Sequence, residues 1–188
     1  MTVPMFSEMP MVNGTFHLTD HNDRKVNTET FRGSFVLVFF GFTHCQVVCP
    51  RALTKLSAAL DAIGDAPIPV TGLYITVDPA RDSPQVMRDF LRSYPRFLGL
   101  TGSQTEIENA KRSFRVFATR SASSLDDGGY DVPHTAFTYL LDPAGQFIAH
   151  FGDAISLSEL VERLRRCFIS SSATGKTIND RLPAHGGC

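Results

Sequence analysis

The sequence has 188 residues, of which 43% are hydrophobic, so it is long enough for one domain with a hydrophobic core and a modest extension. Its 18 Lys and Arg residues nearly balance 19 Asp and Glu residues, and no basic run occurs, which excludes the electrostatic footprint of a nucleic-acid-binding protein. The longest apolar stretch, Phe35–Phe42, is far shorter than the ~20 residues of a membrane-spanning helix. We therefore expect a soluble domain.

Hydrophobic periodicity in the first half predicts strands that alternate with helices. A small hairpin is expected around the polar turn 21–24. Phe35–Phe40 is apolar at every position, which is typical of a central strand that is covered on both faces, and Val70–Val77 is a second strand of this kind. Between them, an apolar stripe at helical spacing predicts a helix that begins near Pro50 and ends at Gly64.

Three further helices have recognisable start signals. Ser83 precedes a proline, and Ser103 and Ser156 each begin the Ser-x-x-Glu pattern of a capping box. A hairpin of strands 135–141 and 147–151 is expected between the last two helices. This order of elements predicts an α/β sandwich with parallel pairing at the centre of its sheet.

The folded domain is expected to span residues 14–169. Residues 170–188 are rich in Ser, Gly and Thr, so we predict a flexible C-terminal tail there. Residues 1–13 contain neither a continuous apolar segment nor a positive region, so no signal peptide or anchor is predicted within them.

The main candidates for chemistry are Cys45 and Cys49, which are four positions apart. They lie between a buried strand and the start of a helix, where unpaired amide groups and the helix dipole stabilise a thiolate. Thiolates attack disulfides and bind soft metals such as Cu(I). The alternative interpretation is a pair of small buried hydrophobic residues.

His134 precedes the strand 135–141 and is the next candidate. If that strand lies beside the first central strand, His134 faces the start of the first helix. Two thiolates and one imidazole would then form a three-ligand site that suits Cu(I) and accepts Cu(II) with an added donor. Spacing alone equally allows an ordinary exposed or hydrogen-bonded histidine. Asp78 ends the second central strand and either supports the ligands or, as we favour, organises a turn together with Asp82.

The remaining histidines and cysteines are weaker candidates. His44 adjoins Cys45 but is expected to point away from its thiol. His150 is predicted on the solvent face of its strand, and Cys167 on the apolar face of the last helix. Cys188 belongs to the predicted tail.

The segment Gly41–Cys45, followed by Cys49–Pro50, resembles the signature of the SCO1/SenC family of copper chaperones. The resemblance extends in order from Gly14 to Phe168. Further matching stretches are Phe31–Gly33, Val77–Pro79 with Arg81–Asp82, Leu98–Gly102, Phe114–Val116, His134–Thr135, Asp142–Pro143 and Phe151–Gly152.

The resemblance implies a thioredoxin-like fold, with a central mixed sheet flanked by helices and an N-terminal β-hairpin. It implies that Cys45, Cys49 and His134 bind copper, as Cu(I) or also as Cu(II). The family consists of membrane-anchored accessory proteins for the Cu-A centre of cytochrome c oxidase, which deliver copper to subunit II or keep its cysteines reduced. Another copper donor or acceptor protein is an alternative partner.

The family's location implies the periplasmic face of the bacterial inner membrane, or alternatively the mitochondrial intermembrane space. Residues 1–13 are accordingly expected to be the linker of a trimmed anchor. The sequence departs from the family pattern at Gln46 and Val47, which replace the usual Pro-Asp, and at Pro133, which replaces an acid. Because fewer acids surround the ligands, we expect altered metal affinity and Cu(II) preference.

The alternative function is a thiol–disulfide oxidoreductase that keeps partner cysteines reduced. In that case Cys45, nearer the exposed turn, attacks the substrate disulfide, and Cys49 resolves the mixed disulfide.

Overall fold

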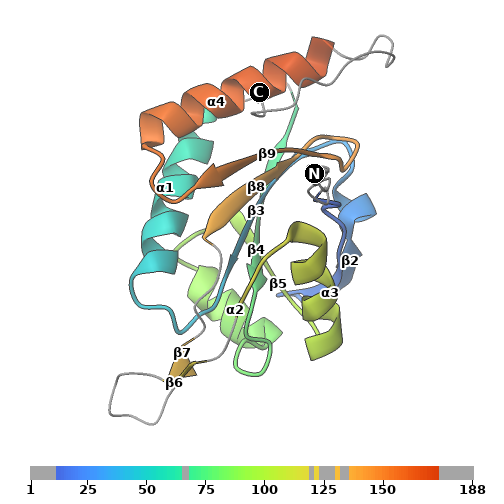
Figure 1. Ribbon diagram of the computed structural model, residues 1–188, viewed down its shortest axis with the longest axis vertical. Helices are drawn as coiled ribbons and strands as arrows, with labels where there is room; N and C mark the ends of the chain where they lie inside the picture. Colours follow the sequence, from blue (N-terminus) through green and yellow to red (C-terminus); the bar gives the residue numbers. More distant parts are fainter. Residues whose placement is uncertain (1–11, 65–67, 119–120, 123–129, 132–135, 174–188) are drawn as a thin grey trace, which may run out of the picture.

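The computed structural model describes residues 12–64, 68–118, 121–122, 130–131 and 136–173. Its centre is a seven-stranded mixed sheet with the strand order β2-β1-β5-β4-β3-β8-β9 (Figure 1). The three central strands, β3, β4 and β5, run parallel, and the outer strands are antiparallel to their neighbours. The strands are β1 (His17–Asp20), β2 (Lys25–Asn27), β3 (Phe35–Gly41), β4 (Val70–Thr76), β5 (Phe97–Thr101), β8 (Phe137–Leu141) and β9 (Phe147–Gly152), with β6 (Ser121–Ala122) and β7 (Tyr130–Asp131) as a separate pair.

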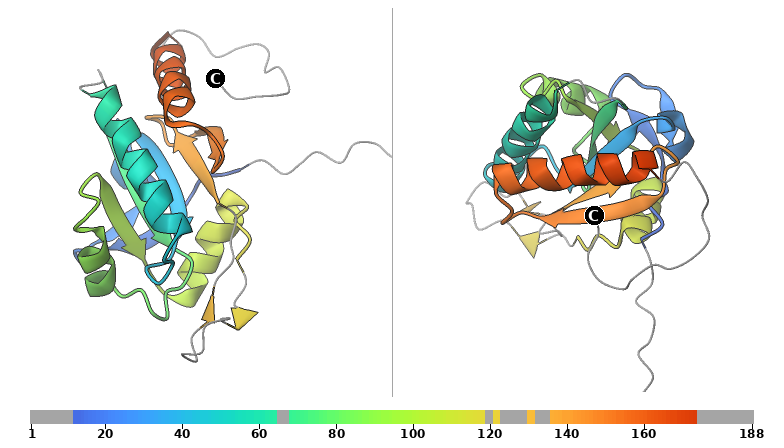
Figure 2. Two further views of the ribbon diagram at one scale, coloured as in Figure 1. Left: turned by 90° about the vertical axis from the view of Figure 1, so that its left-hand side faces the viewer. Right: turned by 90° about the horizontal axis from the view of Figure 1, so that it is seen from above.

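Helices cover both faces of the sheet (Figure 2). Helices α1, α2 and α4 contribute to the hydrophobic cluster on one face, and α3 contributes to the cluster on the other. A short 3-10 helix follows β2. The helices are η1 (Thr28–Phe31), α1 (Val48–Ile63), α2 (Pro84–Leu91), α3 (Gln104–Phe114) and α4 (Leu157–Ala173). The described chain is therefore an α/β sandwich with a mixed sheet.

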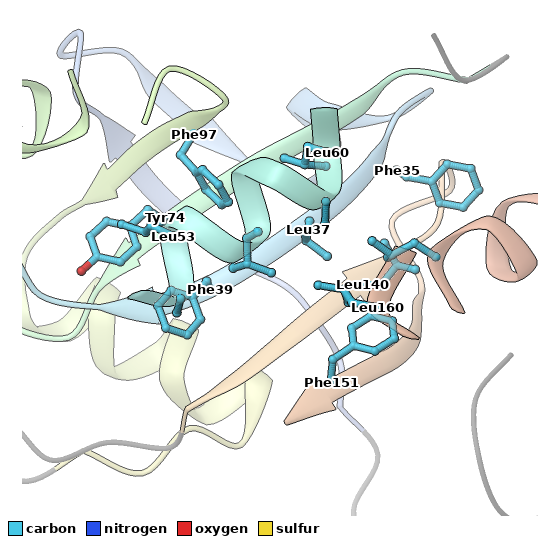
Figure 3. Packing of buried hydrophobic residues seen from close by; sticks show 14 of the residues in the cluster. Phe35, Leu37, Phe39, Leu53, Leu60, Tyr74, Phe97, Leu140, Phe151 and Leu160 are labelled. Carbon is cyan, nitrogen blue, oxygen red and sulfur yellow. The ribbon is translucent and has the colours of Figure 1, made fainter. Parts of the chain in front are cut away.

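The apolar run of β3 is explained by its central position. All seven of its residues are buried. Because side chains alternate along a strand, Phe35, Leu37 and Phe39 point to the cluster under α1 and α4 (Figure 3), whereas the intervening residues point to the cluster under α3. The prediction of a strand covered on both faces is confirmed.

The sheet contains a strand that the hydrophobic pattern did not predict. β5 lies between β4 and β1, and it connects the N-terminal hairpin to the parallel core. Gly99 in its centre lies against α2, where a Cβ atom would come within 2.8 Å of Leu91. Contacts between elements, rather than the local residue pattern, therefore define this strand.

Helix starts agree with the capping signals. The side chains of Ser83 and Ser103 accept hydrogen bonds from the first turns of α2 and α3, and Ser156 Oγ accepts one from Glu159 at the start of α4. The first helix begins at Val48, two residues before the expected start near Pro50. Pro50 is compatible with this earlier start, because the amides of the first turn need no partner within the helix.

The C-terminal boundary of the last helix also differs from the sequence-based expectation. α4 continues to Ala173, past the expected domain end at residue 169. The predicted tail from 174 onward and residues 1–11 lie outside the described residues.

The carboxyl ends of β3 and β4 meet at one edge of the sheet. The Val77 amide donates to the Gly41 carbonyl at 2.8 Å, which continues the pairing one residue beyond the end of β4. β8 is antiparallel to β3, with Thr138 opposite Phe39, so β8 enters the sheet at this same edge. The loop from β3 to α1, which contains both cysteines, leaves the sheet here.

Candidate metal centre

Cys45 and Cys49 are held together by backbone geometry. After β3 the chain turns, and the Cys45 amide donates to the Phe42 carbonyl at 3.2 Å. Val47, the residue before α1, makes no side-chain cap. Instead, the Cys49 amide in the first helical turn donates to the Cys45 sulfur at 3.3 Å. Both thiols are free, with Cys49 fully buried and Cys45 partly exposed.

The two thiols have opposite acidities. A hydrogen bond from the Cys49 thiol lowers the pKa of Cys45 to about 5, and the amides of Val47, Val48 and Cys49 add to the effect against the cost of burial. The same bond to Cys45, together with burial, raises the pKa of Cys49. At neutral pH the metal-free pair therefore consists of a Cys45 thiolate and a Cys49 thiol.

Asp82 fixes the cysteine loop to the neighbouring strand. Its buried carboxylate accepts hydrogen bonds from the Thr43 amide at 3.1 Å, the Thr43 hydroxyl at 2.6 Å and the Thr76 hydroxyl at 2.6 Å. Its backbone carbonyl accepts from Thr101 at 2.7 Å. Burial raises the pKa of Asp82, a cost that these hydrogen bonds oppose. One carboxylate thus connects the ends of β3 and β4.

Asp78 organises the turn between β4 and α2. Its carboxylate is buried and accepts a hydrogen bond from the Arg81 guanidinium, and its carbonyl accepts from the amides of Arg81 and Asp82. This is the turn role that we favoured for Asp78. Its neighbour Asp82 makes the direct contacts with the cysteine loop. His44 is exposed, and its Nδ1 lies 3.1 Å from Thr43 Oγ1.

His134 lies outside the described residues, so its place as a ligand stays a prediction. The described chain resumes at Ala136, which lines a small cavity together with Phe39 and Ala52 of α1. Ala136 therefore lies beside the first turns of α1. Within the described ranges, no three His, Cys, Asp or Glu side chains gather as a metal site.

The model of the SCO1/SenC family matches residues 6–168. The chain belongs to the SCO1/SenC family. It is 40% identical to the mitochondrial SCO2 homolog of Mus musculus over 81% of this chain and 61% of that protein.

Two solved structures are similar to this SCO1/SenC chain. Arabidopsis thaliana ScoI with copper bound has a TM-score of 0.79 and 31% identity, and the match covers 85% of this chain and 99% of that one. Bradyrhizobium japonicum ScoI with copper bound has a TM-score of 0.74 and 39% identity, and the match covers 83% and 99%. The thioredoxin-like fold that the resemblance implied is confirmed.

A further residue of this SCO1/SenC site was not found by sequence reasoning. Tyr74 on β4 is fully buried, and burial together with the neighbouring Cys49 raises the pKa of its hydroxyl well above the ordinary value. A Cβ atom at Gly41 would lie 2.4 Å from this hydroxyl oxygen and 2.8 Å from the Cys49 sulfur. No local signal indicates this contact, because strand pairing and helix packing bring the residues together.

The other candidates of the SCO1/SenC chain lie in ordinary environments. His150 is exposed on β9, with its ring between those of Phe137 and Phe147, as its strand periodicity predicted. Cys167 is a buried core thiol. Cys188 lies outside the described residues. None of the helices in the described ranges is both long and apolar enough to cross a membrane.

Gln46 and Val47, two of the three expected departures from the family pattern, are solvent-exposed in this SCO1/SenC chain, whereas Pro133 lies outside the described residues. Val47 is 67% exposed, although it is apolar and directly precedes α1. The rim of the cysteine loop therefore carries an apolar side chain and a neutral amide.

Proposed function

We propose that this chain binds copper through Cys45, Cys49 and His134. We further propose that it acts as a copper-binding accessory protein in assembly of the Cu-A centre of cytochrome c oxidase. The observation that carries this proposal is the sulfur pair itself. The Cys45 sulfur is already a thiolate, and Cys49 lies in the first turn of α1 at the same edge of the sheet, where its amide donates to that sulfur.

The chemistry of the pair favours Cu(I). Soft thiolates select Cu(I) over harder cations, and a bound metal makes the second thiol lose its proton despite its raised pKa. The two copper-bound ScoI structures, each above 30% identity over more than four fifths of this chain, support the same cargo. An imidazole as third ligand also accommodates Cu(II) with an added donor.

The geometry of described residues supports His134 as the third ligand. His134 is two residues before Ala136, so their Cα atoms are at most about 7 Å apart. Ala136 lines one cavity with Ala52, which is less than one helical turn after Cys49. An imidazole within this reach suits the position of a ligand to the two sulfurs.

Copper titration of the reduced protein tests the three-ligand site. The wild-type chain is expected to bind one Cu(I) in competition with a chromophoric chelator. His134→Ala is expected to bind at least about tenfold more weakly, since even the hydrogen-bond partners of metal ligands contribute 10–100-fold to affinity. His17→Ala, at an exposed position on β1, is the matched control and should leave the affinity unchanged. Equal affinity in His134→Ala and wild type would remove His134 from the site.

We propose subunit II of the oxidase, or another copper donor or acceptor, as the partner. The partly exposed Cys45 sulfur is the ligand that an incoming partner thiolate can replace first, so copper would leave by ligand exchange. Mixing the Cu(I)-loaded chain with a metal-free soluble Cu-A domain should move copper to that domain, as measured by metal analysis after the two proteins are separated. No transfer under these conditions would contradict subunit II as the acceptor.

The proposed location is the periplasmic face of the bacterial inner membrane or the mitochondrial intermembrane space. Membership of the SCO1/SenC family and the mitochondrial mouse relative support this placement. Fractionation of cells that express the full-length natural protein, with protease protection of each compartment, is the direct measurement.

The unequal acidities of the thiols favour a second candidate function, thiol–disulfide oxidoreductase. A partly exposed Cys45 thiolate is suited to attack, and the buried Cys49 thiol is suited to resolve the mixed disulfide. This function predicts metal-free turnover on a disulfide substrate when an added dithiol reductant returns the oxidised cysteine pair to two thiols. Turnover should be lost in Cys45→Ser and retained in His134→Ala. Absence of turnover in the wild-type chain would exclude it.

A further inference from the structure

The Tyr74 ring occupies a fixed position in the core. Tyr74 lies opposite Phe39 in the parallel pairing of β3 and β4, and the two rings stack with centroids 6.1 Å apart. On its other side it stacks on Phe90 of α2 at 5.6 Å. Figure 3 shows the ring within the cluster and its hydroxyl at the margin. Packing on both sides therefore fixes where the hydroxyl points.

The hydroxyl of Tyr74 is a buried donor that lies close to the Cys49 sulfur. Among the described residues, it forms no hydrogen bond of good geometry. Buried hydroxyl groups nearly always have a partner, because water is not available to them in the interior. The Tyr74 hydroxyl therefore needs an explanation that packing alone does not supply.

The absence of a side chain at Gly41 lets this hydroxyl reach the cysteine site. A Cβ atom there would lie 2.4 Å from the Tyr74 oxygen and 2.8 Å from the Cys49 sulfur. Both atoms therefore border the space that a side chain at Gly41 would fill. Tyr74 is thus a polar group directed at the fully buried sulfur of the pair.

We infer that Tyr74 is a positioning residue whose hydroxyl donates a hydrogen bond to the Cys49 sulfur when that sulfur is a metal-bound thiolate. The inference deepens the proposed function and rests on Cys49 as a copper ligand. As a metal ligand, the buried Cys49 sulfur would be a thiolate, for which the Tyr74 hydroxyl would be a preformed donor.

Two variants test this inference. Tyr74→Phe keeps the stacked ring and removes only the hydroxyl. Tyr139→Phe is the matched control, because Tyr139 is also buried but belongs to the cluster on the opposite face of the sheet. Three quantities are measured for both variants and the wild-type chain: Cu(I) affinity, the thiolate-to-Cu(II) charge-transfer band and the thermal midpoint of the metal-free protein.

For Tyr74→Phe we expect about tenfold weaker Cu(I) binding, because a hydrogen bond to a charged group is lost. The charge-transfer band should move to lower energy, since the sulfur electrons lose the stabilising donor. The metal-free thermal midpoint should not fall, because the deleted hydroxyl made no well-formed bond. Tyr139→Phe should leave both copper readouts unchanged.

Wild-type affinity and an unshifted band in Tyr74→Phe would overturn the inference and leave the copper site intact. Equal shifts in Tyr74→Phe and Tyr139→Phe would also overturn it, since they would reflect general repacking. A wild-type chain that binds no copper at the cysteine pair would overturn the proposed function and the inference with it.

Discussion

The low pKa of Cys45 predicts an unusual pH dependence of its reactivity. With a pKa of about 5, its thiolate fraction changes by only about a tenth between pH 6 and pH 8. For an ordinary thiol with a pKa near 8.5, the thiolate fraction rises about 75-fold over the same interval. The absolute rate at pH 7 discriminates poorly, because a less basic thiolate is also a weaker nucleophile. The pH profile is therefore the decisive measurement.

The assay is alkylation of the reduced metal-free protein by iodoacetamide, with each cysteine followed by mass spectrometry of its peptide. A Cys188→Ser background removes the cysteine outside the described residues, and buried Cys167 serves as an internal unreactive control. The Cys45 rate should be nearly constant from pH 6 to pH 8 and fall by half near pH 5. Cys49→Ala should move this midpoint upward, because the Cys49 thiol is the first cause of the low pKa.

A Cys45 midpoint between pH 8 and pH 9 in the wild-type chain would refute the reasoning. So would an unchanged midpoint in Cys49→Ala, since the hydrogen bond between the two thiols would then contribute nothing. Both results would imply that the sulfur pair is not preorganised as a thiolate and a thiol.

The same pKa makes folding stability depend on pH. The folded pKa of Cys45 lies below its unfolded value of about 8.5, so the unfolded chain binds more protons in between. The contribution of Cys45 to the free energy of unfolding is complete above the unfolded pKa and is lost as pH falls towards 5. Urea unfolding at pH 6, 7 and 8 should show this rise in the wild-type chain, and Cys45→Ser should lack that part of it. Parallel pH profiles for the two proteins would contradict the assignment.

Two further predictions concern the support of the site and the core, both measured by urea unfolding. Asp82→Ala should cost about 2–5 kcal/mol, because buried donors from the cysteine loop and β4 lose their acceptor, and it should also raise the alkylation midpoint of Cys45. Asp20→Ala, at a buried carboxylate in the β1–β2 turn, should destabilise without moving that midpoint. Leu53→Ala in the α1 core should cost about 2–5 kcal/mol, whereas Leu157→Ala, at a side chain 41% exposed, should cost less than about 1 kcal/mol.

Local signals in the sequence were sufficient for much of the fold. The all-apolar run of β3, the serine caps of α2 and α3 and the hairpin of β8 and β9 could all be predicted, because each is encoded by neighbouring residues. The position of Cys45 and Cys49 at a strand-to-helix junction is also local, so their chemistry could be anticipated. The boundary of α1 differed by two residues, since proline is compatible with several positions in a first turn.

The tertiary structure decided the features that depend on contacts between distant segments. β5 is a strand because β4, β1 and α2 pack around it, although Gly99 weakens its local pattern. Asp82 contacts the cysteine loop because the turn after β4 directs its carboxylate to that loop, and the Asp78 carboxylate accepts a hydrogen bond from Arg81.

The proximity of the Tyr74 hydroxyl to the Cys49 sulfur next to Gly41 likewise depends on the pairing of β3 with β4 and on the packing of α1 against these strands. The sequence by itself thus determined that two cysteines stand together at a strand-to-helix junction, and it predicted them as the site. Only the tertiary structure decided which distant groups surround them, because short-range patterns carry no information about the partners that sheet pairing and helix packing bring together.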